Sequence, residues 1–71
     1  MSLFFEVWET AKAAYGLSRV IHIDLDEAYM RIYQDEKTIV RVDATLDELE
    51  DLYIAAALRL LQWMQMRGVK L

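Results

Sequence analysis

The chain has 71 residues, of which 56% are hydrophobic, with a formal net charge of −4, one histidine and no cysteine. This length corresponds to a single domain, residues 1–71, that hides only about 60% of the surface its unfolded form exposes. Absence of cysteine excludes disulfides and cysteine-based zinc sites, and the acidic balance disfavours a general phosphate-binding surface. We therefore expect packing and self-association to stabilise the fold.

The first twelve residues carry no early basic residue and no small-residue cleavage site, so we do not expect a signal peptide. No apolar run approaches the roughly 18–20 residues that cross a bilayer. Together with the lack of cysteine, these features favour a cytoplasmic location and no membrane partner.

Residues 3–15 are predicted to form the first helix, because their apolar residues recur at helical spacing. The apolar stripe consists of Leu3, Phe4, Val7, Trp8, Ala11, Ala14 and Tyr15. Gly16 directly follows this stripe, as is typical of the glycine that ends a helix.

The period then changes to two in residues 19–25, 28–34 and 38–43, which predicts three short strands. Asp26-Glu27 is predicted as a two-residue turn and residues 35–37 as a three-residue turn. The first turn pairs Ile23 with Met30, and the second pairs Met30 with Val42. Both registers place the apolar residues on one sheet face, which favours an antiparallel meander.

A second helix is predicted from a capping box at Thr45 and Glu48 to about Arg67, with a stop at Gly68. This helix carries two neighbouring apolar stripes, which together are wider than a single buried face of a little over 100°. The first stripe is expected to cover the sheet: Leu49, Leu52, Tyr53, Ala56, Leu60, Trp63 and Met64. The second stripe needs the first helix or another chain: Ile54, Ala57, Leu58 and Leu61.

The predicted fold class is therefore α+β, with the order αβββα, a three-stranded antiparallel meander and both helices packed on one face. Because the chain is small and carries more apolar surface than one core requires, we expect an interface on the second helix. The expected interface residues are Ile54, Leu58, Leu61 and Met66, together with Phe5.

Three carboxylates, Asp24, Asp26 and Glu27, lie within four residues at the first turn, and oxygen ligands of this kind bind Mg²⁺ or Ca²⁺. The segment 26–30 resembles the acidic hairpin motif of Y-family DNA polymerases, which implies metal-dependent nucleotidyl transfer. However, the palm and fingers of such a polymerase do not fit in 71 residues. Solvated turn acids are the favoured interpretation, and we expect neither a metal nor a cofactor.

The outer sheet face is predicted to present His22, Tyr29, Arg31, Tyr33 and Arg41. Aromatic and arginine side chains on an open sheet stack single-stranded bases, but they also form protein contacts and stabilise sheets. The order of elements is similar to the double-stranded RNA-binding domain, whose last helix begins with a basic cluster. Residues 45–51 hold four acids and no base, so the resemblance supports the architecture only.

No catalytic group is predicted, because the lone His22 has no serine or cysteine nucleophile beside it. The expected function is a small non-enzymatic protein-interaction module that binds itself, as a homodimer or larger, or another protein. Single-stranded nucleic-acid binding on the outer sheet face is the alternative. The size and composition also suit an inhibitor or assembly factor of a phage or other mobile element.

Overall fold

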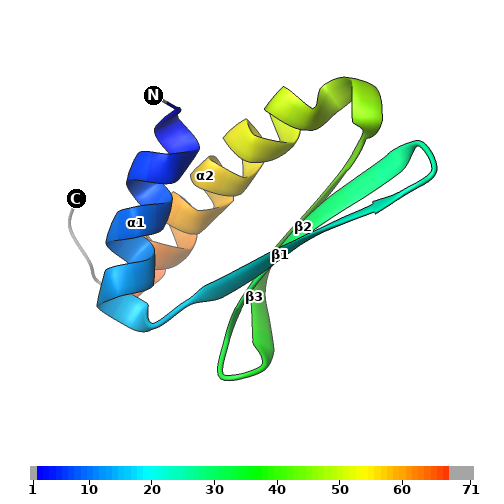
Figure 1. Cartoon of the computed structure of the whole chain (residues 1–71). Helices are drawn as coiled ribbons and strands as arrows, with labels where there is room; N and C mark the ends of the chain where they lie inside the picture. The colour runs from blue at the N-terminus through cyan, green and yellow to red at the C-terminus, as the bar shows by residue number, and fades with distance from the viewer. Residues whose placement is uncertain (1, 68–71) are drawn as a thin grey trace.

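A computed structural model describes residues 2–67 and has the predicted α+β fold. Figure 1 shows a strongly twisted antiparallel meander in the order β1-β2-β3, with two helices side by side on one face. Neither helix in this part of the chain is long and apolar enough to span a membrane. The elements are α1 (Leu3–Tyr15), β1 (Ser18–Asp24), β2 (Glu27–Gln34), β3 (Lys37–Thr45), a 3₁₀ turn η1 (Leu46–Glu48) and α2 (Leu49–Met66).

Helix α1 begins and ends where the sequence predicts. The Ser2 hydroxyl accepts a hydrogen bond from the Phe5 N–H at 3.4 Å, which satisfies one of the free amides at the start of the helix. Gly16 has a φ of +66°, and its N–H donates to the Lys12 carbonyl at 2.9 Å. This left-handed conformation favours glycine and ends the helix.

Strands β2 and β3 pair in the predicted register, with Met30 opposite Val42 and Ile32 opposite Val40. The turn itself is shorter than predicted, because Asp35 and Glu36 alone connect the strands, with φ values of +49° and +68°. A bulge compensates for the missing turn residue. Ile39 lies between the residues that pair with Ile32 and Tyr33, and it has no partner of its own in that pairing.

The predicted register between β1 and β2 is wrong by two residues. Ile21, rather than Ile23, lies opposite Met30, because the turn consists of Leu25 and Asp26 instead of Asp26 and Glu27. A shift of two residues keeps every side chain on its predicted face, so the alternating pattern cannot distinguish the two registers. The inner face of β1 therefore carries Arg19, Ile21 and Ile23.

The second helix starts differently from the predicted capping box. The Thr45 hydroxyl lies 2.9 Å from a Glu48 carboxylate oxygen, to which it donates, and makes no hydrogen bond to a backbone amide at the helix start. The chain first forms η1, whose Leu46 N–H donates to the Asp26 carbonyl in the β1–β2 turn at 2.8 Å. The predicted stop at Gly68 lies outside the described residues.

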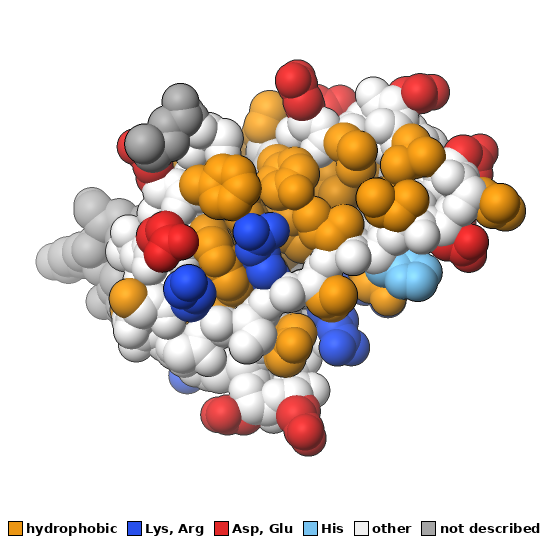
Figure 2. Space-filling view, viewed as in Figure 1, with side chains coloured by type: hydrophobic (Ala, Val, Ile, Leu, Met, Phe, Trp, Pro, Cys, Tyr) orange, Lys and Arg blue, Asp and Glu red, His pale blue; other side chains and the backbone are white. Residues whose placement is uncertain are grey.

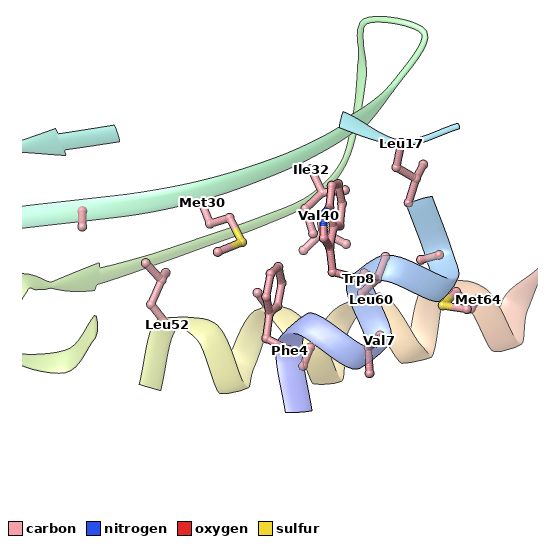
Figure 3. Close-up of a cluster of buried hydrophobic side chains, with 14 residues drawn as sticks. Phe4, Val7, Trp8, Leu17, Met30, Ile32, Val40, Leu52, Leu60 and Met64 are labelled. Atoms are coloured by element: carbon pink, nitrogen blue, oxygen red, sulfur yellow. The ribbon is translucent and has the colours of Figure 1, made fainter. Parts of the chain in front are cut away.

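The core lies between the sheet and the two helices (Figure 3). The largest fully buried side chains come from α1, β2 and α2: Phe4, Met30, Ile32, Leu52, Leu60 and Met64. Small residues on both helices, including Ala11 and Ala57, are also fully buried. Helix α2 packs mainly on β3 and on α1, so the sheet contacts the helices chiefly through β3.

Candidate interaction surface

Eight large apolar side chains are exposed in the described part of the chain: Leu3, Phe5, Val20, Ile23, Leu25, Ile54, Leu58 and Met66. In Figure 2, hydrophobic side chains gather where β1 passes the starts of α1 and α2. Leu3, Phe5, Tyr53 and Ile54 line one shallow hollow between the two helices. We define the apolar band as these four residues together with Ile21 and Ile23 of β1 and Leu25 of the β1–β2 turn.

Two aromatic rings form the helical side of the band. Phe5 and Tyr53 lie 6.2 Å apart, and the buried Phe4 ring meets both edge-on at 5.6 and 5.3 Å. Such edge-to-face contacts stabilise the ring positions by about 0.5–1.5 kcal/mol each. Phe4 therefore fixes Phe5 and Tyr53 from below, while Phe5 keeps 44% of its surface in solvent.

Arg19 links β1 to the aromatic end of α1. Its guanidinium carbon lies 5.1 Å from the Phe4 ring centre, 5.4 Å from that of Phe5 and 5.3 Å from that of Trp8. Cation–π attraction of this kind places a fixed positive charge beside the apolar band. Arg19 is not among the residues predicted from the sequence, because alternation alone does not show that its side chain lies over the aromatic rings of α1.

The β1–β2 turn presents the most exposed apolar side chain among the described residues. Leu25 is 89% exposed and has a φ of +56°. A non-glycine residue in this left-handed region costs about 1–2 kcal/mol. Ile23 precedes it at 56% exposed. The turn therefore combines a strained backbone with an apolar side chain in water. Departures of this kind from the usual residue preferences concentrate at functional sites.

Strand β1 is also an open edge of the sheet, since β2 is its only neighbouring strand within residues 2–67. It pairs with β2 without a bulge over all seven residues, and it contains no proline and no lysine. Proteins usually protect edge strands with such residues or with bulges, because unpaired N–H and C=O groups bind other strands. The β1 edge has no proline, lysine or bulge, and its two charged residues, Arg19 and Asp24, lie toward its ends.

The sequence-predicted interface on α2 is divided by the structure. Ile54 and Leu58 are about half exposed, Leu61 is half-buried and Met66 is 85% exposed. At about 100° per residue, Met66 points about 80° away from Leu58 and about 140° away from Leu61 around the helix axis. Met66 therefore does not share a face with the other three, whereas Ile54 joins the apolar band. The α2 contact stays a prediction.

The outer sheet face brings together three of the predicted binding residues. The His22 and Tyr29 rings stack with centres 5.1 Å apart, and the Arg41 guanidinium lies 4.2 Å from the Tyr29 ring centre. Arg31 lies 5.0 Å from the ring of Tyr33, as a separate pair. The register correction explains the first group. The predicted pairing of Ile23 with Met30 would place His22 opposite Arg31, whereas the structure places it opposite Tyr29.

Acidic groups surround this outer stack. Arg41 donates two hydrogen bonds to the Asp43 carboxylate, at 3.4 and 3.2 Å, which raise the pKa of Arg41 above its ordinary value. Asp24, Glu27 and Glu48 line the same shallow depression. Among residues 2–67, no three acidic or histidine side chains are placed to hold a metal ion. The aromatic faces are thus stacked internally, and the Arg41 charge is already paired.

We compared the chain with protein-family models, curated proteins and solved structures. No family model matches it, and neither the curated proteins nor the solved structures give a significant match.

Proposed function

We propose that this chain is a small protein-interaction module that acts by self-association. The observation that carries this proposal is the apolar band, an uncovered surface that continues from the hollow between the helices to the β1 edge. Contiguous apolar patches of this kind on small proteins mark contact sites for other proteins. Such a module suits an assembly factor or inhibitor encoded by a phage or other mobile element and acting in the cytoplasm.

The side chains of the band can supply the energy of a modest dimer. Phe5, Ile23 and Leu25 retain 44%, 56% and 89% of their exposure. Fully burying such a residue stabilises a contact by about 1.5–3 kcal/mol, so covering these exposed fractions contributes about 3–6 kcal/mol per chain. The total for two chains is of the same order as the loss of rigid-body freedom on association, about 4–15 kcal/mol.

A contact through the outer face of α2 is the route that the sequence predicts. Ile54 and Leu58 support it, because both are about half exposed, although the half-buried Leu61 has less surface to offer. The double substitution Leu58→Glu with Leu61→Glu tests this route. If α2 forms the contact, the variant is a monomer or unfolds.

Binding of single-stranded nucleic acid is the second candidate. The stack of His22, Tyr29 and Arg41 supports it, because bases stack on such platforms. The carboxylates around the stack oppose it, because they repel phosphates. Self-association is the better supported of the two.

The solution mass over a dilution series tests the proposed function. Light scattering is expected to give about 17 kDa, twice the 8.4 kDa of one chain, at high concentration and a decrease on dilution. A mass of one chain throughout the series, up to the solubility limit, would overturn self-association.

A further inference from the structure

We propose that two copies associate through their β1 edges. The strands pair antiparallel about a two-fold axis at Ile21, and the two three-stranded sheets become one sheet of six strands. This inference rests on the proposed self-association and specifies its surface, its symmetry and its register.

The first argument is the state of the edge. Within residues 2–67, no strand lies along the edge of β1 that faces away from β2. The seven residues of β1 pair with β2 without a bulge. A second β1 satisfies the free N–H and C=O groups of this edge, in the same way that extended peptides add to exposed sheet edges. Two exposed apolar side chains, Val20 and Ile23, belong to the same strand.

The second argument is the register. A two-fold axis perpendicular to the sheet pairs residues of one face with residues of the same face in the partner. Ile21 is the midpoint of Ser18–Asp24, so an axis there uses the whole strand. Arg19 then lies opposite the partner's Ile23, and Val20 lies opposite the partner's His22. An axis moved by one residue, to His22, leaves the first two residues of β1 without a strand partner.

The third argument is charge. The first half of β1 carries Arg19, and the helix before it ends near Lys12, whereas the far end carries Asp24, Asp26 and Glu27. An antiparallel arrangement brings the basic half of each copy beside the acidic tip of its partner. A parallel arrangement would align like charges. The complementarity therefore favours a second copy that is related by a two-fold axis.

The fourth argument is the surface available for burial. Pairing places the inner faces of both β1 strands side by side, so Ile21 and Ile23 of each copy form one apolar strip beside Phe5 and Tyr53 of each band. A standard interface covers about 800 Å² per partner, which is about a sixth of the 4977 Å² accessible surface of this chain. The seven-residue edge and the adjoining apolar band offer a surface long enough for such a contact.

Two substitutions at Ile23 test both the surface and the register. Ile23→Lys and Ile23→Glu remove the same apolar side chain from a position that is already 56% exposed, so both leave the folded monomer intact. They differ in the charge placed opposite the partner's Arg19. Leu58→Glu is the matched control, because Leu58 is 52% exposed on the outer face of α2. Circular dichroism confirms folding, and light scattering over a dilution series gives the dissociation constants.

The expected result is a folded monomer for Ile23→Lys and an unchanged dimer for Leu58→Glu. Two cross-strand charge pairs per dimer make Ile23→Glu dimerise at least about tenfold more tightly than Ile23→Lys. Amide exchange of Ser18–Asp24 slows in the wild-type chain as its concentration rises.

Three results would contradict the inference in different ways. A wild-type chain that stays monomeric at all concentrations overturns both the proposed function and the β1 contact. A Leu58→Glu monomer beside an unchanged Ile23→Lys dimer leaves self-association in place and overturns the β1 contact. Equal dissociation of Ile23→Lys and Ile23→Glu overturns the register about Ile21.

Discussion

The two edge strands of the sheet have similar sequences but different surroundings. Both β1 and β3 alternate apolar and polar residues, and both have one neighbour, β2. On β3, Val40 is buried and the other apolar side chains are at least partly covered. On β1, Val20 and Ile23 are 40% and 56% exposed. One edge is thus part of the core, and the other is left open.

The difference arises from the helix to which each strand is connected. β3 runs directly through η1 into α2, and α2 folds back over β3. α1 precedes β1 but packs chiefly on α2, which leaves the far half of β1 without a helix above it (Figure 1). Helix placement, rather than the alternation of residues in a strand, determines which edge is available for a partner.

The largest expected effect comes from placing the same charge on both edges. Val40→Lys buries an ammonium group in the core and is expected to lower the free energy of unfolding by more than about 3 kcal/mol. Ile23→Lys is expected to lower it by less than about 1 kcal/mol, because its side chain reaches water. Urea unfolding at concentrations where the chain is monomeric measures both values. Equal losses would show that the β1 edge is covered as well as β3.

Substitutions in the two hairpin turns are expected to change the stability of the monomer by a smaller amount. Leu25→Gly and Glu36→Gly both relieve a positive φ, of 56° and 68°, and each is expected to stabilise the monomer by about 0.5–1 kcal/mol. Thermal unfolding of the dilute chain measures this gain. Only Leu25→Gly removes apolar surface beside the β1 edge, so it alone is expected to weaken self-association. Weakening by Glu36→Gly to the same extent would place the contact elsewhere.

The charged pair on β3 tests whether charges keep that edge from pairing with another strand. Arg41→Thr with Asp43→Thr removes two exposed charges, and we expect no measurable change in the unfolding midpoint. Sedimentation velocity is expected to show species larger than dimers, because the second edge loses its charge protection. Glu9→Thr with Lys12→Thr, an exposed pair on α1, is the matched control. If both variants form the same species, charges on β3 do not protect the edge.

The smallest expected effect concerns nucleic acid. A fluorescent oligothymidine at low salt is expected to show no change in anisotropy with this chain, because carboxylates surround the Tyr29 stack. Salt-sensitive binding that is lost in Tyr29→Ala would assign the function to the outer sheet face instead of the β1 edge.

Most of the fold could be predicted because local signals agreed with the overall pattern. Gly16 ended α1, and alternation placed Ile21, Met30, Ile32, Val40 and Val42 on the inner sheet face, where the structure has them. The register between β1 and β2 could not be predicted, because a two-residue shift leaves that alternation unchanged. The turn was misplaced by one residue because Leu25 was assigned to the strand and not to the turn. The place of Leu25 in a left-handed turn violates the residue preferences on which turn prediction depends.

The candidate site was predicted only in part for a related reason. The excess of apolar residues indicated an uncovered surface, and Phe5 and Ile54 belong to it. The part of this surface on β1 could not be located from the sequence. The exposure of β1 depends on the packing of α1 against α2, which the sequence pattern does not specify. Met66 was grouped with Ile54 because both lie off the first stripe, although helical geometry separates them.

The packing of α1 on α2 also bears on the order in which the chain folds. The three strands and η1 connect neighbours through short turns, whereas Phe4 meets Tyr53 across 49 positions of the sequence. Contacts between distant residues form late, since closing a long loop costs entropy. Helix α1 is synthesised before α2, so it cannot complete its packing until α2 is present. Until then, Phe4 lacks the edge-to-face contact with Tyr53.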